Sequence, residues 1–287
     1  MQFSLRHNKE MKSTYARKFF KKNFGQANHF LITCLVGLDV IENGTVAKSN
    51  NFSTTWNPKS PINSARRSRD FVLEAFLSRL VDGLDVYLSI LHKNDFYLSN
   101  INPNSVFDPN EKSIYKKIDG TSNYFLINDY LCSLVKLSII WRNLSTHYFT
   151  SNSNKLDYVD IVTLKKNKED ISKNFCRLDI EDILRKYETT SPTFKEVASL
   201  INAIHKYVEK VDDLIISKIN KNDYFLKTIN TCFKDHPELY NKYYILLKDN
   251  DSRRKIFIKN LLQNMAHLSS EDLNVVNFNE LISILNK

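Results

Sequence analysis

The sequence predicts an all-α protein, and two observations carry this prediction. The 287 residues include only five glycines and six prolines, whereas an all-β sandwich or barrel needs such turn-forming residues about every 8–12 positions. In addition, apolar residues recur at steps of three and four over long stretches, which is the spacing of one face of an α-helix. No two glycines have the spacing of a Walker A loop or of a Rossmann G-x-G-x-x-G turn, which excludes the common nucleotide-binding loops.

The composition is that of a soluble folded chain with an excess of positive charge. Hydrophobic residues make up 42% and charged residues 25%, and 41 Lys and Arg against 32 Asp and Glu give a formal net charge of +9. A basic chain favours polyanions such as nucleic acid as partners. An AT-rich genome, which biases a sequence toward Lys, Asn and Ile, accounts for the same excess, so charge alone leaves both interpretations open.

No segment of the sequence indicates a membrane, a metal or a disulfide framework. The longest apolar run, residues 30–38, is too short to span a bilayer, and the basic N-terminus is not followed by a signal-like apolar stretch. We therefore expect a cytoplasmic protein without membrane contact. The four cysteines are far apart and form no C-x-x-C pair, so we expect buried free thiols and no zinc site.

The N-terminal part combines a basic segment, a short helix and a loop. The first 26 residues mix lysines and arginines with tyrosine and phenylalanine, so they either follow a nucleic-acid backbone or form a helix docked through its aromatic side chains. Residues 29–42 form an apolar segment that we expect to be helical and to end at Asn43-Gly44. The polar run 48–63, with two prolines, predicts a loop.

A long amphipathic helix is predicted over residues 64–91, where leucines recur at helical spacing, with Asn63-Ser64 as its cap. Its first turns carry Arg66, Arg67 and Arg69, which we expect to contact a substrate phosphate; an exposed solubilising cluster is the alternative. Residues 94–121 predict a loop with one short helical piece at 113–118.

The second half of the chain predicts further helices. One runs over residues 124–148, and shorter ones follow at 166–175 and 180–187. Pro192 and a T-x-x-E capping box from Thr193 to Glu196 begin a strongly amphipathic helix over 193–219. Three more helical patterns follow, at 225–247 with an interruption at Pro237, at 252–265, and at 270–285 with Ser269 or Ser270 as its cap.

The segment that can carry chemistry ends the helix predicted over 124–148. Asn143 and His147 lie one helical turn apart on the same face, and the long side chain of Arg142 reaches the same point. An imidazole, with an ordinary pKa of about 6.5, exchanges a proton at neutral pH, and a guanidinium holds phosphate oxygens and offsets negative charge in a transition state. Asn143 or Ser145 can orient the imidazole or the phosphate. The structural alternative is that Arg142 and His147 cap carbonyls or pair with acids such as Asp82 or Asp85.

The pattern Arg142-Asn143-x-x-x-His147 resembles the R-N-x-x-x-H motif of HEPN-domain ribonucleases, a family of all-α proteins that includes bacterial toxins and phage-defence effectors. The order of the long helices is also similar, and the resemblance covers about residues 63–219. It implies a HEPN-like helical bundle over 63–219, preceded by the basic and aromatic segment and loop at 1–62 and followed by a C-terminal helical extension at 220–287.

The resemblance implies an enzyme that cleaves RNA without a metal, leaves a 2′,3′-cyclic phosphate and assembles its site from two facing motifs. Because RNA carries its own 2′-hydroxyl nucleophile, no cofactor is expected. The chain has one motif, so a homodimer is implied, with Arg142 and His147 as the catalytic pair and Asn143 as a support. Family members with R-x4-H-x-Y use the tyrosine as a modification site in toxin and antitoxin pairs; here that position is Phe149 and the tyrosine is Tyr148. The resemblance also implies an antitoxin or other regulatory partner. The shift of the tyrosine to position 148 argues against control through its modification.

Two other classes of function remain open at this level. The chain is alternatively a catalytically inactive helical module that binds RNA or a protein partner, as some HEPN proteins are, or a plain helical scaffold. The scaffold hypothesis predicts that Arg142 and His147 take part in buried hydrogen bonds. The RNA target, the activating trigger and the roles of residues 1–62 and 220–287 do not follow from the sequence.

Overall fold

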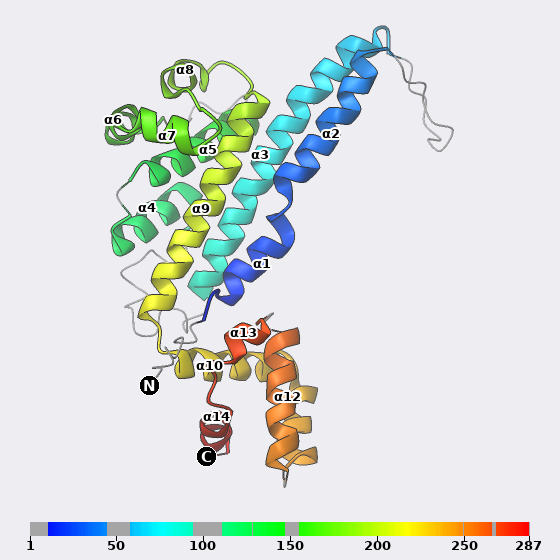
Figure 1. The fold of residues 1–287 in the computed structure, drawn as a ribbon, viewed down its shortest axis with the longest axis vertical. Helices are drawn as coiled ribbons and strands as arrows, with labels where there is room; N and C mark the ends of the chain where they lie inside the picture. Colours follow the sequence, from blue (N-terminus) through cyan, green and yellow to red (C-terminus); the bar gives the residue numbers. More distant parts are fainter. Residues whose placement is uncertain are drawn as a thin grey trace, which may run out of the picture. The chain divides into compact units, whose positions relative to one another are not determined.

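The computed structural model describes residues 11–44, 58–93, 111–127, 129–146, 155–248, 250–265 and 268–286. Every regular element in these residues is a helix (Figure 1), which confirms the predicted all-α class. The helices are α1 (Tyr15–Phe24), α2 (Ala27–Glu42), α3 (Pro61–Lys93), α4 (Ile114–Phe125), α5 (Tyr130–Thr146), α6 (Tyr158–Lys166), α7 (Lys168–Asn174), α8 (Ile180–Lys186), α9 (Phe194–Lys218), α10 (Lys221–Asp235), α11 (Pro237–Asn241), the π-helix η2 (Lys242–Leu246), α12 (Asp251–Asn264), α13 (Ser270–Leu273) and α14 (Phe278–Leu285).

The chain divides into two compact units. The terminal unit comprises Met1–Lys22, Tyr87–Glu111 and Glu209–Lys287, and the central unit comprises Asn23–Val86 and Lys112–Val208. Three of the four limits between them fall inside α1, α3 and α9, and the fourth lies between Glu111 and Lys112, before α4. The domain limits predicted after residues 62 and 219 rest on sequence pattern alone and stay a prediction.

Helix α3 is the long amphipathic helix that the leucine spacing predicts, and it extends beyond residues 64–91 at both ends. The leucines of that spacing are buried: Leu73, Leu77, Leu80, Leu84, Leu88 and Leu91. Helix α2 ends where Asn43-Gly44 predicts, and Gly44 has a positive φ of 77°. In the central unit α2 and α3 lie side by side in opposite directions (Figure 1), and Arg69 of α3 forms ion pairs with Asp39 and Glu42 of α2.

The contact between Phe24 and α3 depends on a glycine. A Cβ added to Gly83 would lie 2.6 Å from carbons of the Phe24 ring, which is far inside van der Waals contact. The guanidinium of Arg79 lies 5.7 Å from the centre of the same ring. The ring therefore occupies the space that a larger side chain at position 83 would need.

The helix that carries the Arg142 motif begins later than predicted. Helix α5 begins at Tyr130 and not at Tyr124, because α4 ends first at Leu126, whose left-handed φ of 55° cannot continue a helix. Helix α4 confirms the short helical piece predicted at 113–118 and is longer than predicted, and Ser113 caps its first turn. The apolar spacing continues across the break, so periodicity alone did not locate it.

A buried polar network lies between α4, α5 and α6. The ammonium of Lys136 lies 2.5 Å from a carboxylate oxygen of Asp119 and 3.1 Å from one of Asp160. The hydroxyls of Ser133 and Tyr115 donate to the carboxylate of Asp160 at 2.6 and 3.3 Å. Burial disfavours the charged form of Lys136, but the hydrogen bonds to the two carboxylates outweigh it and hold the pKa of Lys136 above its ordinary value.

Three short helices follow in the central unit, where two were predicted. Helices α7 and α8 correspond to the predictions at 166–175 and 180–187, whereas α6 was not predicted. The exposed side chains of Tyr158 and Val159 interrupt the apolar spacing of α6. Helix α9 confirms the prediction over 193–219, and the N–H of Thr193 donates to the carboxylate of Glu196 at 2.7 Å, which is one half of the predicted capping box.

The helices of the terminal unit follow the predicted pattern with one correction. The interruption at Pro237 is present, because α10 ends at Asp235 and α11 begins at the proline. The pattern at 252–265 is α12. The single helix predicted over 270–285 is two helices, α13 and α14, since Ser269 caps the first and Asn277 caps the second.

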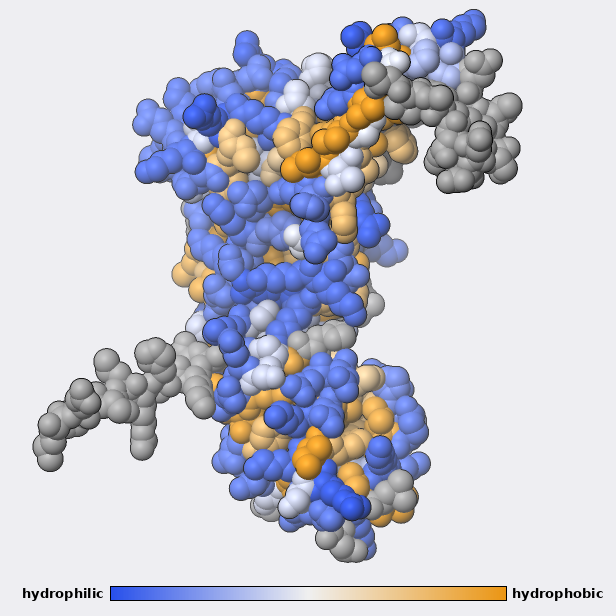
Figure 2. Space-filling view, turned by 45° about the vertical axis from the view of Figure 1, so that its right-hand side comes forward, coloured by the Kyte–Doolittle hydropathy of each residue, from blue (hydrophilic) through white to orange (hydrophobic). Residues whose placement is uncertain are grey.

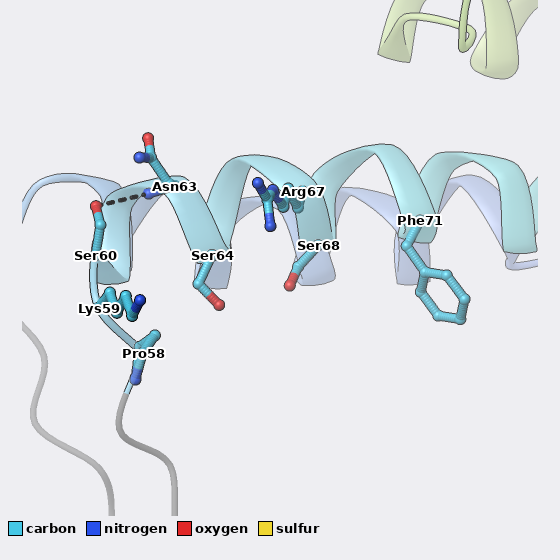
Figure 3. A pocket seen from close by; sticks show the side chains of 8 residues that line it. All are labelled: Pro58, Lys59, Ser60, Asn63, Ser64, Arg67, Ser68 and Phe71. Carbon is cyan, nitrogen blue, oxygen red and sulfur yellow. Dashed lines mark hydrogen bonds between the residues drawn. The ribbon is translucent and has the colours of Figure 1, made fainter.

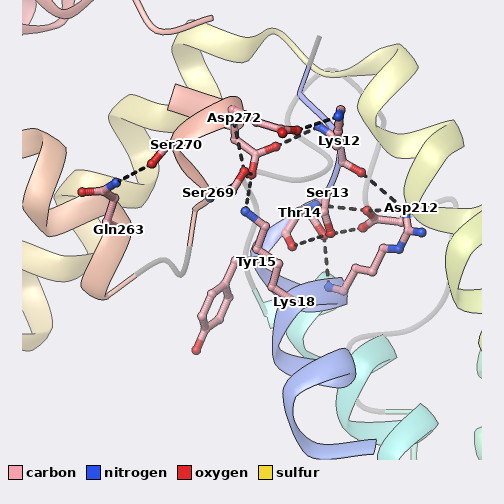
Figure 4. A network of polar contacts seen from close by, with 12 residues as sticks. Lys12, Ser13, Thr14, Tyr15, Lys18, Asp212, Gln263, Ser269, Ser270 and Asp272 are labelled. Carbon is pink, nitrogen blue, oxygen red and sulfur yellow. Dashed lines mark hydrogen bonds and ion pairs between the residues drawn. The ribbon is translucent and has the colours of Figure 1, made fainter. Parts of the chain in front are cut away.

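Residues 11–14 lead into helix α1, which is docked as in the second of the two interpretations of this basic segment (Figure 4). Phe20 is buried. Thr14 donates its N–H to the carboxylate of Asp212 at 3.0 Å and its hydroxyl to the same group. The side chain of Arg17 is only 6% exposed and lies 3.1 Å from Asp213. Buried hydrogen bonds and ion pairs thus hold Thr14 and Arg17 within the terminal unit.

Asp212 is expected to make the protein less stable as the pH rises from about 4 to about 6. Burial raises the pKa of Asp212 from its ordinary value of 3.8 to about 6, although the hydrogen bonds from Thr14 and the charge of Arg17 act in the opposite direction. Between pH 4 and pH 6 the folded chain holds a proton on Asp212 that the unfolded chain releases. The contribution of this proton to the free energy of unfolding is therefore full below pH 4 and is lost above pH 6. It amounts to at most about 3 kcal/mol.

Urea unfolding of the wild type and of Asp212→Asn between pH 4 and 7 measures this contribution. The free energy of unfolding of the wild type, relative to that of the variant, should fall with rising pH. A constant difference would contradict the expected proton linkage.

One stretch of the described residues, Tyr15–Glu42, is long and apolar enough to cross a membrane by length and composition. The sequence predicts no segment of this length when the apolar run 30–38 is considered alone. The stretch reaches this length because helix α1 precedes α2. Core helices of soluble proteins and signal sequences have the same property. The cytoplasmic location stays a prediction.

Two of the four cysteines differ from the expectation of buried thiols. Cys34 and Cys176 are exposed, whereas Cys132 is buried and Cys232 is half-buried. Burial raises the pKa of the Cys132 thiol to about 11. All four are free, as expected.

Candidate functional site

Helix α5 brings the Arg142 motif from the interior of the central unit to its surface. Every residue from Leu131 to Trp141 is buried, and the next four are partly exposed. Trp141 anchors this end of the helix, because its indole N–H donates to the carbonyl of Thr190 at 3.0 Å. Residues Arg142 and Asn143 therefore stand on a rigid element at the point where it leaves the core.

Arg142 is held by an acid on the neighbouring helix and by the residue that follows it. Its guanidinium forms an ion pair with Asp82 of α3 and donates to the side-chain carbonyl of Asn143 at 2.9 Å. The Arg142 side chain is 21% exposed and that of Asp82 is 60% exposed. The structure thus brings Arg142 and Asn143 together, as predicted, and selects Asp82 as the acid that contacts the motif.

Asp85, the other acid that the sequence offered, has a different partner. Its carboxylate lies 2.6 Å from the ammonium of Lys117, which is nearly buried on α4. The sequence contains no signal for this contact, because Lys117 lies in a stretch predicted to be a short helical piece within a loop. The pairing leaves Asp82 as the acid beside the motif.

The contacts of Ser145 do not support its predicted role in orienting the imidazole or the phosphate. Its hydroxyl donates to the carbonyl of Trp141 in its own helix at 3.0 Å. Ser145 also lines a small hollow of about 70 Å³ together with Glu74 and Glu188. Two carboxylates beside this hollow disfavour a phosphate there.

His147 lies outside the described residues, as do Tyr148 and Phe149. The structure therefore describes the arginine end of the motif, and the pairing of Arg142 with His147 stays a prediction. The described residues contain no group of three or more His, Cys, Asp or Glu side chains that could hold a metal ion.

The three arginines predicted to bind substrate lie on the first turns of α3, away from Arg142. Arg67 and Asp82 are separated along α3 by about 22 Å at the helical rise of about 1.5 Å per residue. Arg69 is engaged by Asp39 and Glu42, and the guanidinium of Arg66 lies 3.9 Å from Glu42. These three side chains do not share a site with Arg142.

Arg67 stands at a pocket of about 560 Å³ at the beginning of α3 (Figure 3). The lining side chains are mostly polar, with one exposed aromatic ring: Pro58, Lys59, Ser60, Asn63, Ser64, Arg67, Ser68 and Phe71. Within the described part of the chain Arg67 makes no hydrogen bond or ion pair. Of the three arginines, Arg67 is therefore the one available to a ligand.

Comparisons of the chain with protein-family models, with curated proteins and with solved structures found no match.

Proposed function

We propose that this chain is a metal-independent endoribonuclease of the HEPN type that acts as a homodimer. Arg142 and His147 of two copies flank the scissile phosphate, and Asn143 supports Arg142. The observation that carries the proposal is the placement of Arg142: a partly exposed guanidinium, oriented by Asp82 and Asn143, at the surface end of a buried helix. A HEPN-like bundle over 63–219 is part of the same proposal.

The environment of Arg142 suits an anion that arrives from solvent. A guanidinium held in one orientation loses little conformational entropy when it binds a phosphate. Asp82 is mostly exposed, so its ion pair with Arg142 contributes little stability. The guanidinium has five N–H donors, so it can contact a phosphate while Asp82 and Asn143 keep it oriented.

The chemistry is a transesterification that needs only proton transfer and charge stabilisation. The 2′-oxygen attacks the phosphorus and gives its proton to the imidazole of His147 in one copy. The bond from phosphorus to the 5′-oxygen breaks, and protonated His147 of the other copy supplies the proton to that oxygen. Arg142 stabilises the negative charge of the pentacovalent phosphorane. The products are a 2′,3′-cyclic phosphate and a 5′-hydroxyl.

The biological role in the proposal is that of a cytoplasmic toxin or phage-defence effector, which an antitoxin or other regulatory partner keeps inactive. This role is supported by analogy with the family whose motif the chain resembles. The excess positive charge of the chain is consistent with RNA as the substrate.

A second candidate function is a catalytically inactive helical module that binds RNA or a protein. The ion pair between Arg142 and Asp82 favours it, because a structural arginine at a helix end makes the same contact. The two candidates differ in whether RNA is cut.

Incubation of the purified protein with RNA in excess EDTA tests the proposal. The expected result is cleavage whose 5′ fragments end in a 2′,3′-cyclic phosphate. Such ends resist 3′ ligation after phosphatase alone and become ligatable when acid opens the ring before the phosphatase treatment. RNA that is bound but stays intact under all conditions would support the binding module. Cleavage that EDTA abolishes would contradict the proposed mechanism.

A further inference from the structure

The pocket at the beginning of α3 lies within the central unit, and one continuous stretch of chain, residues 58–71, supplies its lining. Its volume of about 560 Å³ falls in the range of about 300–1,000 Å³ that is typical of pockets for small ligands. In Figure 2 hydrophilic residues form most of the visible surface at the upper end, where Figure 1 places the beginning of α3. The surroundings of this pocket therefore suit a polar ligand.

The lining of the pocket carries positive charge without compensation. Lys59 and Arg67 are its charged residues, and none of the eight lining residues is an acid. Glu42 of α2 lies 3.9 Å from Arg66 and 3.2 Å from Arg69, and neither of these arginines lines the pocket. Within the described part of the chain, Lys59 and Arg67 form no ion pair. The pocket thus presents two positive charges to an anion.

Hydroxyl groups lie beside these two cations. The side chains of Ser64, Ser68 and Phe71 project from the same side of α3 (Figure 3), as residues spaced by four and three positions on a helix do. The hydroxyl oxygen of Ser60 accepts the N–H of Asn63 at 3.3 Å, which leaves the other two hydroxyls as donors for a ligand. A guanidinium, an ammonium and hydroxyl donors are groups that bind phosphate oxygens in proteins.

Phe71 adds an aromatic face to the pocket. It is 71% exposed, and within the described residues its ring contacts no other ring and no cation. A single exposed phenylalanine is ordinary on a protein surface, but this one lies one helical turn from Arg67, about 6 Å along the axis. An aromatic ring beside a basic side chain suits a nucleotide, because the base stacks on the ring while the phosphate binds the cation.

We propose that this pocket binds a nucleoside phosphate, with its phosphate at Arg67 and Lys59 and its base on the ring of Phe71. A simple anion would leave the ring without a role, and a neutral aromatic ligand would leave the two charges without one. A free nucleotide and one nucleotide of a single RNA strand share this chemistry. The pocket contains neither Arg142 nor Asn143, so its ligand does not depend on the proposed cleavage.

Two substitutions remove the two halves of the site. Arg67→Ala removes the guanidinium, and Phe71→Ala removes the ring. The matched controls are Arg185→Ala and Phe30→Ala, because these side chains are exposed on α8 and α2, outside the pocket. Phe71→Trp keeps an aromatic face and should restore binding. All of these positions are exposed, so the variants should fold, and circular dichroism checks that they do.

Fluorescence anisotropy with a short, labelled, 2′-O-methylated RNA strand measures binding apart from cleavage, because this strand lacks the 2′-hydroxyl nucleophile. Arg67→Ala and Phe71→Ala are each expected to raise the dissociation constant about 5- to 100-fold. Arg67→Ala should also make the slope of log affinity against log salt shallower by about 0.7, the effect of one lost phosphate contact on a single strand. Phe71→Ala should leave this slope unchanged, and both controls should bind as the wild type does.

Calorimetric titration with adenosine monophosphate, uridine monophosphate and inorganic phosphate separates the sources of the ligand. Mononucleotide binding that depends on Arg67 and Phe71 would support a free nucleotide. Binding of the strand alone, with the same dependence, would support a nucleotide within RNA. Affinity that depends on Arg67 but not on Phe71 would assign the pocket to simple anions and overturn the proposal. A wild type that binds none of these probes, or variants with unchanged affinity, would also overturn it.

The cleavage assay distinguishes failure of this proposal from failure of the proposed function. A chain that binds the uncleavable strand through Arg67 and Phe71 but leaves ordinary RNA intact would support the pocket and contradict the nuclease. Cleavage of RNA by a chain whose binding is unchanged in both variants would contradict the pocket alone.

Discussion

Replacing Arg142 by alanine is expected to lower the rate of RNA cleavage about 10²- to 10³-fold while the fold is retained. Among the motif residues that the structure describes, Arg142 carries a fixed positive charge at the surface end of α5. Alanine removes the charge that offsets the phosphorane, and a partly exposed position tolerates the loss of the side chain. Initial rates on a labelled RNA in EDTA, with circular dichroism of each variant, measure the effect.

The matched control is Arg185→Ala. The side chain of Arg185 is 78% exposed on α8 and pairs with Asp182 within its own helix, so its removal should leave the rate unchanged. His147→Ala should lower the rate as strongly as Arg142→Ala, because the proposed proton transfers need the imidazole. Full activity of a folded Arg142→Ala variant would refute the proposed role of this residue and leave its ion pair with Asp82 as a structural contact.

Replacing Lys136 by methionine is expected to lower the free energy of unfolding by about 3–5 kcal/mol. The ammonium of Lys136 neutralises Asp160, whose carboxylate is buried, and also pairs with Asp119. Methionine has nearly the same shape but leaves a buried carboxylate without its cation. Urea unfolding at pH 7, with parallel slopes for wild type and variant, measures the change.

Lys155→Met provides the control for this prediction. Lys155 pairs with Glu188 at the surface, where its side chain is 70% exposed, so its removal should change the stability by less than about 1 kcal/mol. Adding Asp160→Asn to Lys136→Met should recover part of the loss, because it removes the unpaired charge. Equal, small effects of both lysine substitutions would show that the buried network does not contribute to stability.

The sequence by itself determined the features that depend on neighbours along the chain. The leucine spacing of α3, the proline and capping box before α9, and the end of α2 at Asn43-Gly44 all predicted what the structure contains. Each of these signals arises from contacts within a few residues, through helical periodicity or through hydrogen bonds at helix ends. The arginine end of the motif belongs to this class, since Arg142 and Asn143 are adjacent.

Tertiary structure alone decided the contacts between distant parts of the chain. Asp82 and not Asp85 contacts Arg142, because Lys117 on α4 takes Asp85. Arg67 stands apart from the motif because the length of α3 separates them. Side chains with the same local pattern acquire different partners once helices pack, since the packing geometry, and not the spacing along one helix, sets which charges are buried together. Helix packing also determines the break between α4 and α5 and the network around Lys136.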